Sequence, residues 1–214
     1  KSTKITFNIL DLCKKLSVKR LLFASSMAVY GDPKKLPVTE ESVCNPISYY
    51  AVAKLVSEHI IQSYSISSGI EYSILRFFNI YGPGQDLKRM DQGLVSIYLS
   101  MLMSNSPLVI KGKLDRIRDL VHIDDVVSSM VTIMESDKAI NKVINICSGQ
   151  GTSIERLLRI LISHFDQYGW DDIIEEEGSP SDIHQIWANN DLLLSHIGYK
   201  IKYDDIKQLK IIYD

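Results

Sequence analysis

Residues 20–25 read RLLFAS, a short apolar run that begins at an arginine and ends at a serine. An apolar run of this length, bounded by polar residues, is typical of a strand buried in a sheet. The segment before it carries apolar residues at the spacing of an amphipathic helix, at Ile5, Ile9, Leu12 and Leu16. A helix that leads into a buried strand is characteristic of α/β folds, so this stretch sets the expected fold class.

The same alternation continues along the chain and predicts an α/β fold with a largely parallel sheet. Strands are expected at residues 71–79, 107–112, 118–125 and 142–149. Helices are expected at residues 48–67, 91–104, 126–136 and 152–165, with two short helices at 189–198 and 204–213. The expected helix caps are Ser48 and Gly69 for the helix 48–67, and Asp124 or Asp125 for the helix 126–136.

Composition and charge exclude several classes of protein. The chain has 214 residues, 45% of them hydrophobic, and a net charge of -2, which provides no general attraction to nucleic acid. No apolar run reaches the roughly 18 to 20 residues that span a bilayer, and the first segment, KSTKITFNIL, lacks the apolar core of a signal peptide. Three dispersed cysteines and five histidines show no metal-ligand spacing. We expect a cytoplasmic protein with no nucleic-acid or membrane partner and no metal.

A doubly wound fold normally opens with a strand, a Gly-rich turn and a helix that hold a nucleotide pyrophosphate. This sequence has G-x-G only at Gly82 to Gly84 and at Gly149 to Gly151, and neither continues to the third glycine. Its first expected element is a helix, and no methionine precedes Lys1. We therefore expect the sequence to begin inside a domain, without the first strand–helix units of the sheet.

Tyr50 and Lys54, in YYAVAK (49–54), lie one turn apart on the same face of the expected helix. A lysine ammonium at this spacing could act on the phenol and make it an acid/base group. The spacing alone is a weak signal, because it recurs at Tyr30 and Lys34 and at Tyr203 and Lys207.

The position of Tyr50 in the chain is more informative than its spacing. Its helix follows a strand that ends in Ser25 and Ser26 and precedes a strand that ends in Asn79. Because the carboxyl ends of neighbouring parallel strands lie side by side, we expect these side chains to converge on one crevice, within reach of Tyr50.

Six segments, in this order, resemble the extended short-chain dehydrogenase/reductase family, the nucleotide-sugar epimerases and dehydratases. They are FASSMAVYG (23–31), SYYAVAK (48–54), ILRFFNIYGPG (74–84), RDLVHIDDVV (118–127), INICSGQGTSI (144–154) and SPSDIHQIWANNDLLLSHIGY (179–199). The chain is most similar to the UDP-glucose 4-epimerase branch. The resemblance implies a partial doubly wound, Rossmann-like parallel sheet and a smaller C-terminal α/β region that binds a nucleotide sugar.

The resemblance also implies roles for single residues. Tyr50 would be the catalytic tyrosine, and Lys54 would bind the nicotinamide ribose of NAD and favour the phenolate. Ser26 would hydrogen-bond the sugar hydroxyl that loses its proton. Ser25 and Phe78 would join these three residues around the cofactor.

Two further residues would bind the nucleotide part of the substrate. Asn79 would offer its amide to the diphosphate, and Arg118 would reach the nucleotide phosphates. The resemblance places residues 1–85 and 119–148 in the NAD-binding domain, and residues 86–118 and 149–214 in the substrate-binding region.

Three positions depart from the family pattern. Ala28 stands where many relatives have threonine, and Ser179 where relatives often have an arginine that grips the diphosphate, so we expect weaker phosphate binding. Met27 and Ala28 also replace the aspartate and glutamate that 4,6-dehydratases use to eliminate water, which disfavours dehydration.

The function expected from the resemblance is NAD-dependent epimerisation of a nucleotide sugar at C4 through a 4-keto intermediate. The nucleotide is UDP in the branch that the chain resembles most, and a homodimer is a possible assembly. Two alternatives remain open: an NAD(P)-dependent 4-keto-sugar reductase of the same family, and an inactive remnant or binding subunit without its Gly-rich loop.

Overall fold

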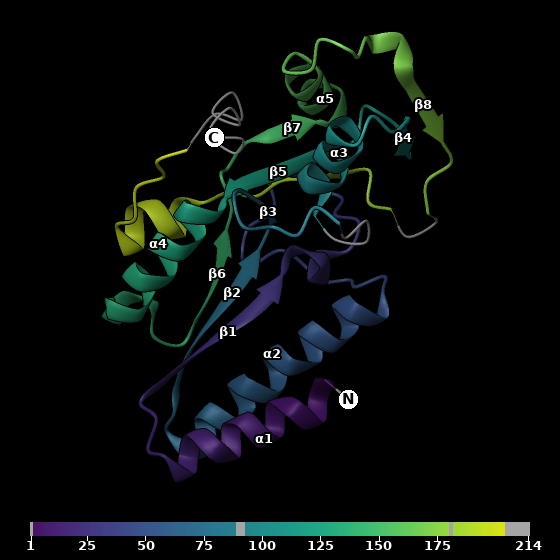
Figure 1. The fold of residues 1–214 in the computed structure, drawn as a ribbon. Helices are drawn as coiled ribbons and strands as arrows, with labels where there is room; N and C mark the ends of the chain where they lie inside the picture. Colours follow the sequence, from purple (N-terminus) through teal and green to yellow (C-terminus); the bar gives the residue numbers. More distant parts are fainter. Residues whose placement is uncertain (1, 89–92, 180–181, 204–214) are drawn as a thin grey trace.

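The computed structural model describes residues 2–88, 93–179 and 182–203 (Figure 1). Its α-helices are α1 (Ser2–Lys15), α2 (Tyr49–Ser68), α3 (Leu94–Met103), α4 (Ile123–Glu135) and α5 (Ile154–Ile162). Its strands are β1 (Arg20–Ser26), β2 (Glu71–Phe77), β3 (Asn79–Tyr81), β4 (Leu108–Lys111), β5 (Ile117–His122), β6 (Lys142–Ile146), β7 (Gly151–Ser153), β8 (Ile173–Glu176) and β9 (Gln185–Ile186). This alternation confirms the predicted α/β fold.

The main sheet is parallel, with strand order β1-β2-β6. Helices α1 and α2 lie on one side of it and α4 lies on the other (Figure 1). Consecutive residues of β2 show the two buried faces, because Ile74 packs with α1 and α2 residues while Leu75 packs with α4 residues. Cover on both faces explains why apolar residues occupy successive positions of these strands, as at Leu21 and Leu22 in β1 and at Ile74 and Leu75 in β2.

The strand predicted at residues 71–79 is broken at Phe78. β2 ends at Phe77, and β3 begins at Asn79 in a different sheet, where it pairs with β5 in parallel. At the break, the Phe78 amide donates to the carbonyl of Ile146 at 3.1 Å, and the Phe78 ring is buried. The sequence ILRFFN contains neither glycine nor proline, so its pattern gives no sign of the break.

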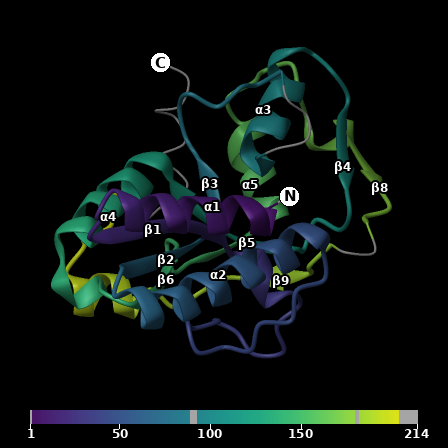
Figure 2. The ribbon, with the colours of Figure 1, turned by 90° about the horizontal axis from the view of Figure 1, so that it is seen from below.

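The second sheet contains β3, β5, the antiparallel β7 and the short parallel β9. Strands β4 and β8 pair in parallel as a separate ribbon. In Figure 2 this ribbon lies at the margin of the molecule, beside α3 and α5. A cluster of buried residues from α3, β4 and α5 fills the space between them.

Helix α1 is present as predicted, but a different face of it is buried. Its buried side chains are Thr6, Leu10 and Cys13. The apolar residues that predicted the helix, Ile5, Ile9, Leu12 and Leu16, are 44–66% exposed. The helix therefore has a second apolar face, which is largely exposed among the described residues.

Helix α4 begins two residues earlier than an N-cap at Asp124 would require. The N-cap is His122, whose Nδ1 accepts a hydrogen bond from the Asp124 amide at 3.1 Å. The buried carboxylate of Asp125 binds the C-terminal segment instead, accepting from the Tyr199 hydroxyl at 2.5 Å and from the Tyr203 amide at 3.0 Å. The predicted aspartate cap is therefore wrong, because the Asp125 carboxylate binds the C-terminal segment and not the first turn of α4.

Two sequence expectations, the helix at 204–213 and the division into two regions, concern features that the structure does not test. The short helix expected at 189–198 is present as Leu192–Ile197, whereas the helix expected at 204–213 lies outside the described residues. The division into NAD-binding and substrate-binding regions stays a prediction. Among the helices of the described ranges, none is long and apolar enough to cross a membrane.

Candidate functional site

A pocket of about 440 Å³ lies where β1 and β2 end and α2 begins. Its lining includes six of the seven predicted site residues, together with Ala24, whose carbonyl binds Lys54. The full lining is Ala24, Ser25, Ser26, Tyr50, Lys54, Phe77, Phe78, Asn79, Ile80, Gln85, Gly93 and Leu94. The structure therefore brings together every predicted site residue except Arg118, as expected for the carboxyl edge of a parallel sheet.

Helix α2 presents Tyr50 and Lys54 to this pocket. The Ser48 hydroxyl accepts from the Ala51 amide at 3.1 Å and Gly69 ends the helix at φ 75°, which confirms both predicted caps. Tyr50 is 56% exposed in the first turn. The ammonium of Lys54 lies 5.6 Å from the centre of the Tyr50 ring.

Lys54 is held in place by the backbone. Its ammonium donates to the carbonyl of Ala24, in β1, at 2.6 Å. Burial lowers the pKa of Lys54 from its ordinary value. An ammonium has three donors, so the bond to Ala24 leaves donors for a ligand hydroxyl.

The spacing of Tyr30 and Lys34 does not form a comparable pair. Tyr30 is buried and donates its hydroxyl to Asn145 Oδ1 at 2.6 Å, while Lys34 is exposed. Burial raises the pKa of Tyr30 to about 12. The third tyrosine–lysine spacing, Tyr203 and Lys207, includes a residue, Lys207, that lies outside the described ranges.

The two serines at the end of β1 have different partners. Ser25 is buried and its hydroxyl donates to the carboxylate of Glu58. The Ser26 hydroxyl accepts from the Ala28 amide at 3.3 Å, at the start of a short 3₁₀ helix, Met27–Tyr30. Because Ser26 only accepts in this bond, its own proton remains available to a ligand in the pocket.

A buried ion pair behind the pocket supports the end of β1. Glu58 binds Arg76 through two hydrogen bonds, of 2.7 and 3.2 Å, and also accepts from Ser25. The side chains of Glu58 and Arg76 are only 2% and 6% exposed. Sequence reasoning missed this pair, although Glu58 lies one helical turn beyond Lys54 on the same helix.

Phe78 and Asn79 border the pocket on the side of the second sheet. The ring of Phe78 packs in a buried cluster with Val29 and Tyr30 while it also lines the pocket. The Asn79 side chain donates to the Asp119 carbonyl at 3.2 Å. One donor and the carbonyl oxygen of the Asn79 amide remain for other partners.

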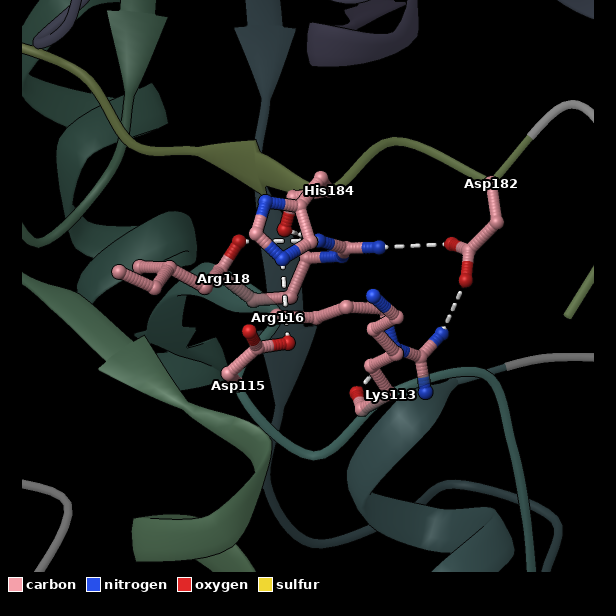
Figure 3. Close-up of polar contacts among 7 residues, drawn as sticks. Lys113, Asp115, Arg116, Arg118, Asp182 and His184 are labelled. Atoms are coloured by element: carbon pink, nitrogen blue, oxygen red, sulfur yellow. Dashed lines mark hydrogen bonds and ion pairs between the residues drawn. The ribbon is translucent and has the colours of Figure 1, made fainter. Parts of the chain in front are cut away.

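Arg118 lies in β5, outside the lining of the pocket, and its guanidinium is bound by protein groups (Figure 3). It donates to Asp182 at 2.8 Å and to the carbonyl oxygens of Ile117 and His184. A second arginine, Arg116, binds the other oxygen of Asp182. The sequence pointed to Arg118 but not to Arg116.

The pocket fits the nicotinamide end of a dinucleotide in its chemistry. It combines a lysine ammonium, a serine hydroxyl and a phenol, which can bind ribose hydroxyls, with the flat apolar side chains of Phe77 and Phe78. Among the residues in the described ranges, no group of three or more His, Cys, Asp or Glu could hold a metal ion.

The sequence profile of the NAD dependent epimerase/dehydratase family matches residues 1–147. The chain belongs to this family. Its curated relatives include a putative UDP-glucose 4-epimerase of Methanocaldococcus jannaschii, 38% identical over 157 residues, which cover 73% of this chain and 50% of the relative. The chain thus spans about half the length of this relative.

Solved structures of family members share the fold. A UDP-N-acetylglucosamine 4-epimerase from Methanobrevibacter ruminantium M1, in complex with UDP-N-acetylmuramic acid, is 28% identical with a TM-score of 0.88. The match covers 97% of this chain and 66% of that chain. A UDP-glucuronic acid 4-epimerase from Bacillus cereus, in complex with UDP-glucuronic acid and NAD, is 28% identical with a TM-score of 0.85, over 98% of this chain and 68% of that chain.

Proposed function

We propose that the protein epimerises a UDP-linked sugar at C4 and uses NAD as its cofactor. The observation that carries this proposal is the gathering of Ser26, Tyr50, Lys54 and Asn79 around one pocket. Membership of the NAD-dependent epimerase/dehydratase family supports it, as do relatives that are named as 4-epimerases of UDP sugars.

Tyr50 is the proton acceptor in this proposal. Its phenolate takes the proton of the C4 hydroxyl, and the ammonium of Lys54, 5.6 Å from the ring centre, stabilises the anion. Ser26 donates its free hydroxyl proton to the oxygen at C4 and orients it. Asn79 contacts the diphosphate through the amide groups that its bond to Asp119 leaves free.

The reaction conserves atoms and electrons. NAD, when bound, would accept hydride from C4 and return it to the opposite face of the resulting 4-keto sugar. Tyr50 gives its proton back to the C4 oxygen when the hydride returns, so that the enzyme ends in its starting protonation state.

Replacement of Tyr50 tests the proposal in the full-length protein. Tyr50→Phe removes the proton acceptor and keeps the ring, so we expect turnover to fall by about 10²-fold or more. NAD content should stay unchanged. Tyr49→Phe is the matched control, because Tyr49 is 97% exposed and does not line the pocket. Near-normal turnover of Tyr50→Phe would refute the proposed role.

Analysis of the products separates epimerisation from reduction of a 4-keto sugar. An epimerase converts UDP-glucose and UDP-galactose into each other with no net use of NAD. Stoichiometric oxidation of added NADPH with a UDP-4-keto sugar, and no interconversion of the two epimers, would favour the reductase. Absence of NAD binding and of both reactions would favour a binding role.

A further inference from the structure

Glu58 connects the helix that carries Lys54 to two strands of the main sheet at once. Its carboxylate accepts from the Ser25 hydroxyl in β1, and from the guanidinium of Arg76 in β2 at 2.7 and 3.2 Å. Ser25 and Arg76 are register partners in the parallel pair of β1 and β2. One side chain of α2 therefore fixes the helix against both strands at the same level, at the end of β1 that borders the pocket.

This connection lies next to the one that Lys54 makes. Lys54 precedes Glu58 by one helical turn, about 6 Å along the axis of α2. The ammonium of Lys54 donates to the carbonyl of Ala24 at 2.6 Å, and Ala24 is the residue before Ser25 in β1. Two consecutive turns of α2 thus bind two consecutive residues of β1, so the surroundings of Glu58 and of Lys54 are directly coupled.

The charge of Lys54 depends on opposing effects in its surroundings. Its ammonium lies 5.2 Å from the centre of the Phe23 ring and 5.6 Å from that of the Tyr50 ring, and aromatic faces favour a cation at this range. Burial acts in the other direction and lowers the pKa of Lys54. A further positive charge nearby would add to the effect of burial and disfavour the ammonium.

Arg76 brings such a charge to this place. Burial acts to lower the pKa of Arg76, but the hydrogen bonds and the charge of Glu58 outweigh it and raise that pKa. Arg76 is therefore a buried cation, and Glu58 is the carboxylate that cancels its charge. Without Glu58, the guanidinium would act uncompensated on Lys54 over a distance of about 10 Å, as the geometry of helix and strand allows.

Three more titratable groups face Arg76 from other elements. The ring of Tyr30, in the short 3₁₀ helix, lies 4.8 Å from Cζ of Arg76, and burial raises the pKa of Tyr30 to about 12. In the loop before α2, the Glu40 carbonyl accepts from Arg76 at 3.2 Å, and burial raises the pKa of the Glu40 carboxyl group. Burial also raises the pKa of Cys44, where the charge of Arg76 opposes the rise and that of Glu58 adds to it. Because a thiol can titrate in the same range as a lysine, Cys44 has to be replaced in the test.

We propose that Glu58 is a positioning residue, which keeps Lys54 charged in its place against β1 by cancelling the charge of Arg76. The inference rests on the proposed function, in which the ammonium of Lys54 stabilises the phenolate of Tyr50. Glu58 does not line the pocket, whereas Lys54 does. Its effect on the reaction therefore passes through the charge of Lys54.

The titration of Lys54 tests the proposal without reliance on turnover. It is followed by NMR in the full-length protein with carbon-13 at the lysine Cε atoms, in a Cys44→Ala parent, and Lys54→Arg identifies the signal. Glu58→Gln should lower the midpoint of this titration by about one pH unit, because it leaves the charge of Arg76 uncompensated. Glu155→Gln is the matched control, since it removes a carboxylate from an exposed pair on α5 and should leave the midpoint unchanged.

A double-mutant cycle separates the effect of charge from that of stability. Arg76→Gln alone leaves the carboxylate of Glu58 uncompensated and should raise the midpoint. The double variant of Glu58→Gln and Arg76→Gln has neither charge, so its midpoint should return to that of the parent. If Glu58 contributes only to stability, all three variants titrate at the parent's midpoint with less folded protein, and the proposal is wrong.

The same measurements distinguish this proposal from the proposed function. Unchanged midpoints, together with loss of turnover in Tyr50→Phe, would refute only the role of Glu58. The expected shifts in a protein that does not epimerise would refute only the proposed function, since they show the effect of Glu58 on Lys54 directly. If Glu58→Gln does not fold, Arg76→Gln and the double variant decide: a midpoint that rises in the first and returns in the second supports the proposal, and equal midpoints overturn it.

Discussion

The ammonium of Lys54 donates to the carbonyl oxygen of Ala24 at 2.6 Å and thereby ties α2 to the end of β1. The bond uses a backbone acceptor, so it does not depend on which side chains line the pocket. It fixes the charge beside Tyr50 before any ligand binds, and such preorganisation increases the effect of a charge on a reacting group.

Replacement of Lys54 should change the pH dependence of turnover. Burial lowers the pKa of Lys54, so the ammonium loses its charge, and the activity falls, at a lower pH than for an ordinary lysine. Lys54→Arg keeps the charge at all accessible pH values, and we expect its alkaline limb to move to higher pH. Lys54→Met should lose activity at every pH. A pH–rate profile of Lys54→Arg identical to that of the wild type would contradict the role of this ammonium.

The buried pair of Glu58 and Arg76 should matter more for stability than an exposed pair of the same kind. Glu58→Gln leaves Arg76 without its carboxylate, and we expect the free energy of unfolding to fall by about 3 kcal/mol or more. Glu155→Gln breaks the exposed pair with Arg159 on α5 and should cost less than about 0.5 kcal/mol. Urea denaturation measures both, and equal losses would show that burial of the first pair has no consequence.

Ser48 should stabilise the start of α2, where Tyr50 lies. Ser48→Ala removes the acceptor of the Ala51 amide and should lower the free energy of unfolding by about 1 kcal/mol. Ser48→Asp retains an acceptor and should stay near the wild-type value. Chemical denaturation distinguishes the two variants; if alanine and aspartate behave alike, the cap makes no contribution.

Asp119 should make stability depend on pH. Burial raises the pKa of its carboxyl group to about 6, from an ordinary value of 3.8, although donors from Ser148, Gly149 and Ala188 act in the opposite direction. Because the folded state favours the protonated form, this contribution to stability is complete below about pH 4 and is lost as the pH rises through about 6. The difference corresponds to about 3 kcal/mol.

A comparison with Asp119→Asn isolates this titration from those of the other carboxyl groups. The variant loses acceptors for the same donors, so we expect it to be less stable than the wild type at low pH. Its disadvantage should shrink between pH 4 and pH 7, measured by urea denaturation at each pH. A disadvantage that stays constant or grows over this range would show that the pKa is not raised.

The residues of the pocket could be predicted from the sequence because they stand at the ends of predicted strands. Ser25, Ser26 and Asn79 stand at strand ends, and neighbouring parallel strands end at one edge of a sheet. The caps Ser48 and Gly69 follow local rules in the same way. The order of strands and helices therefore predicted that Tyr50 and Lys54, and not Tyr30 and Lys34, line the pocket.

Features that depend on distant residues were not predictable. Arg116 and Asp182 are separated by 66 positions, and nothing local relates them. The apolar residues that predicted α1 do not lie on its buried face, because the helix has apolar residues on two faces. His122 is an uncommon N-cap. Its ring nitrogen caps α4, while the Asp125 carboxylate accepts a hydrogen bond from Tyr199 in the C-terminal segment.

The break at Phe78 fixes the number of residues between β2 and β3. Asn79 is the register partner of Leu120, which packs in the α3 cluster, whereas the next residue, Ile80, packs in the cluster of α4. Because side chains alternate with a period of two, one residue more or fewer between Phe77 and Asn79 would exchange these two faces. The position of Asn79 in the pocket thus depends on the number of residues at this crossing as much as on their identity. Substitutions here are far less disruptive than an insertion or a deletion.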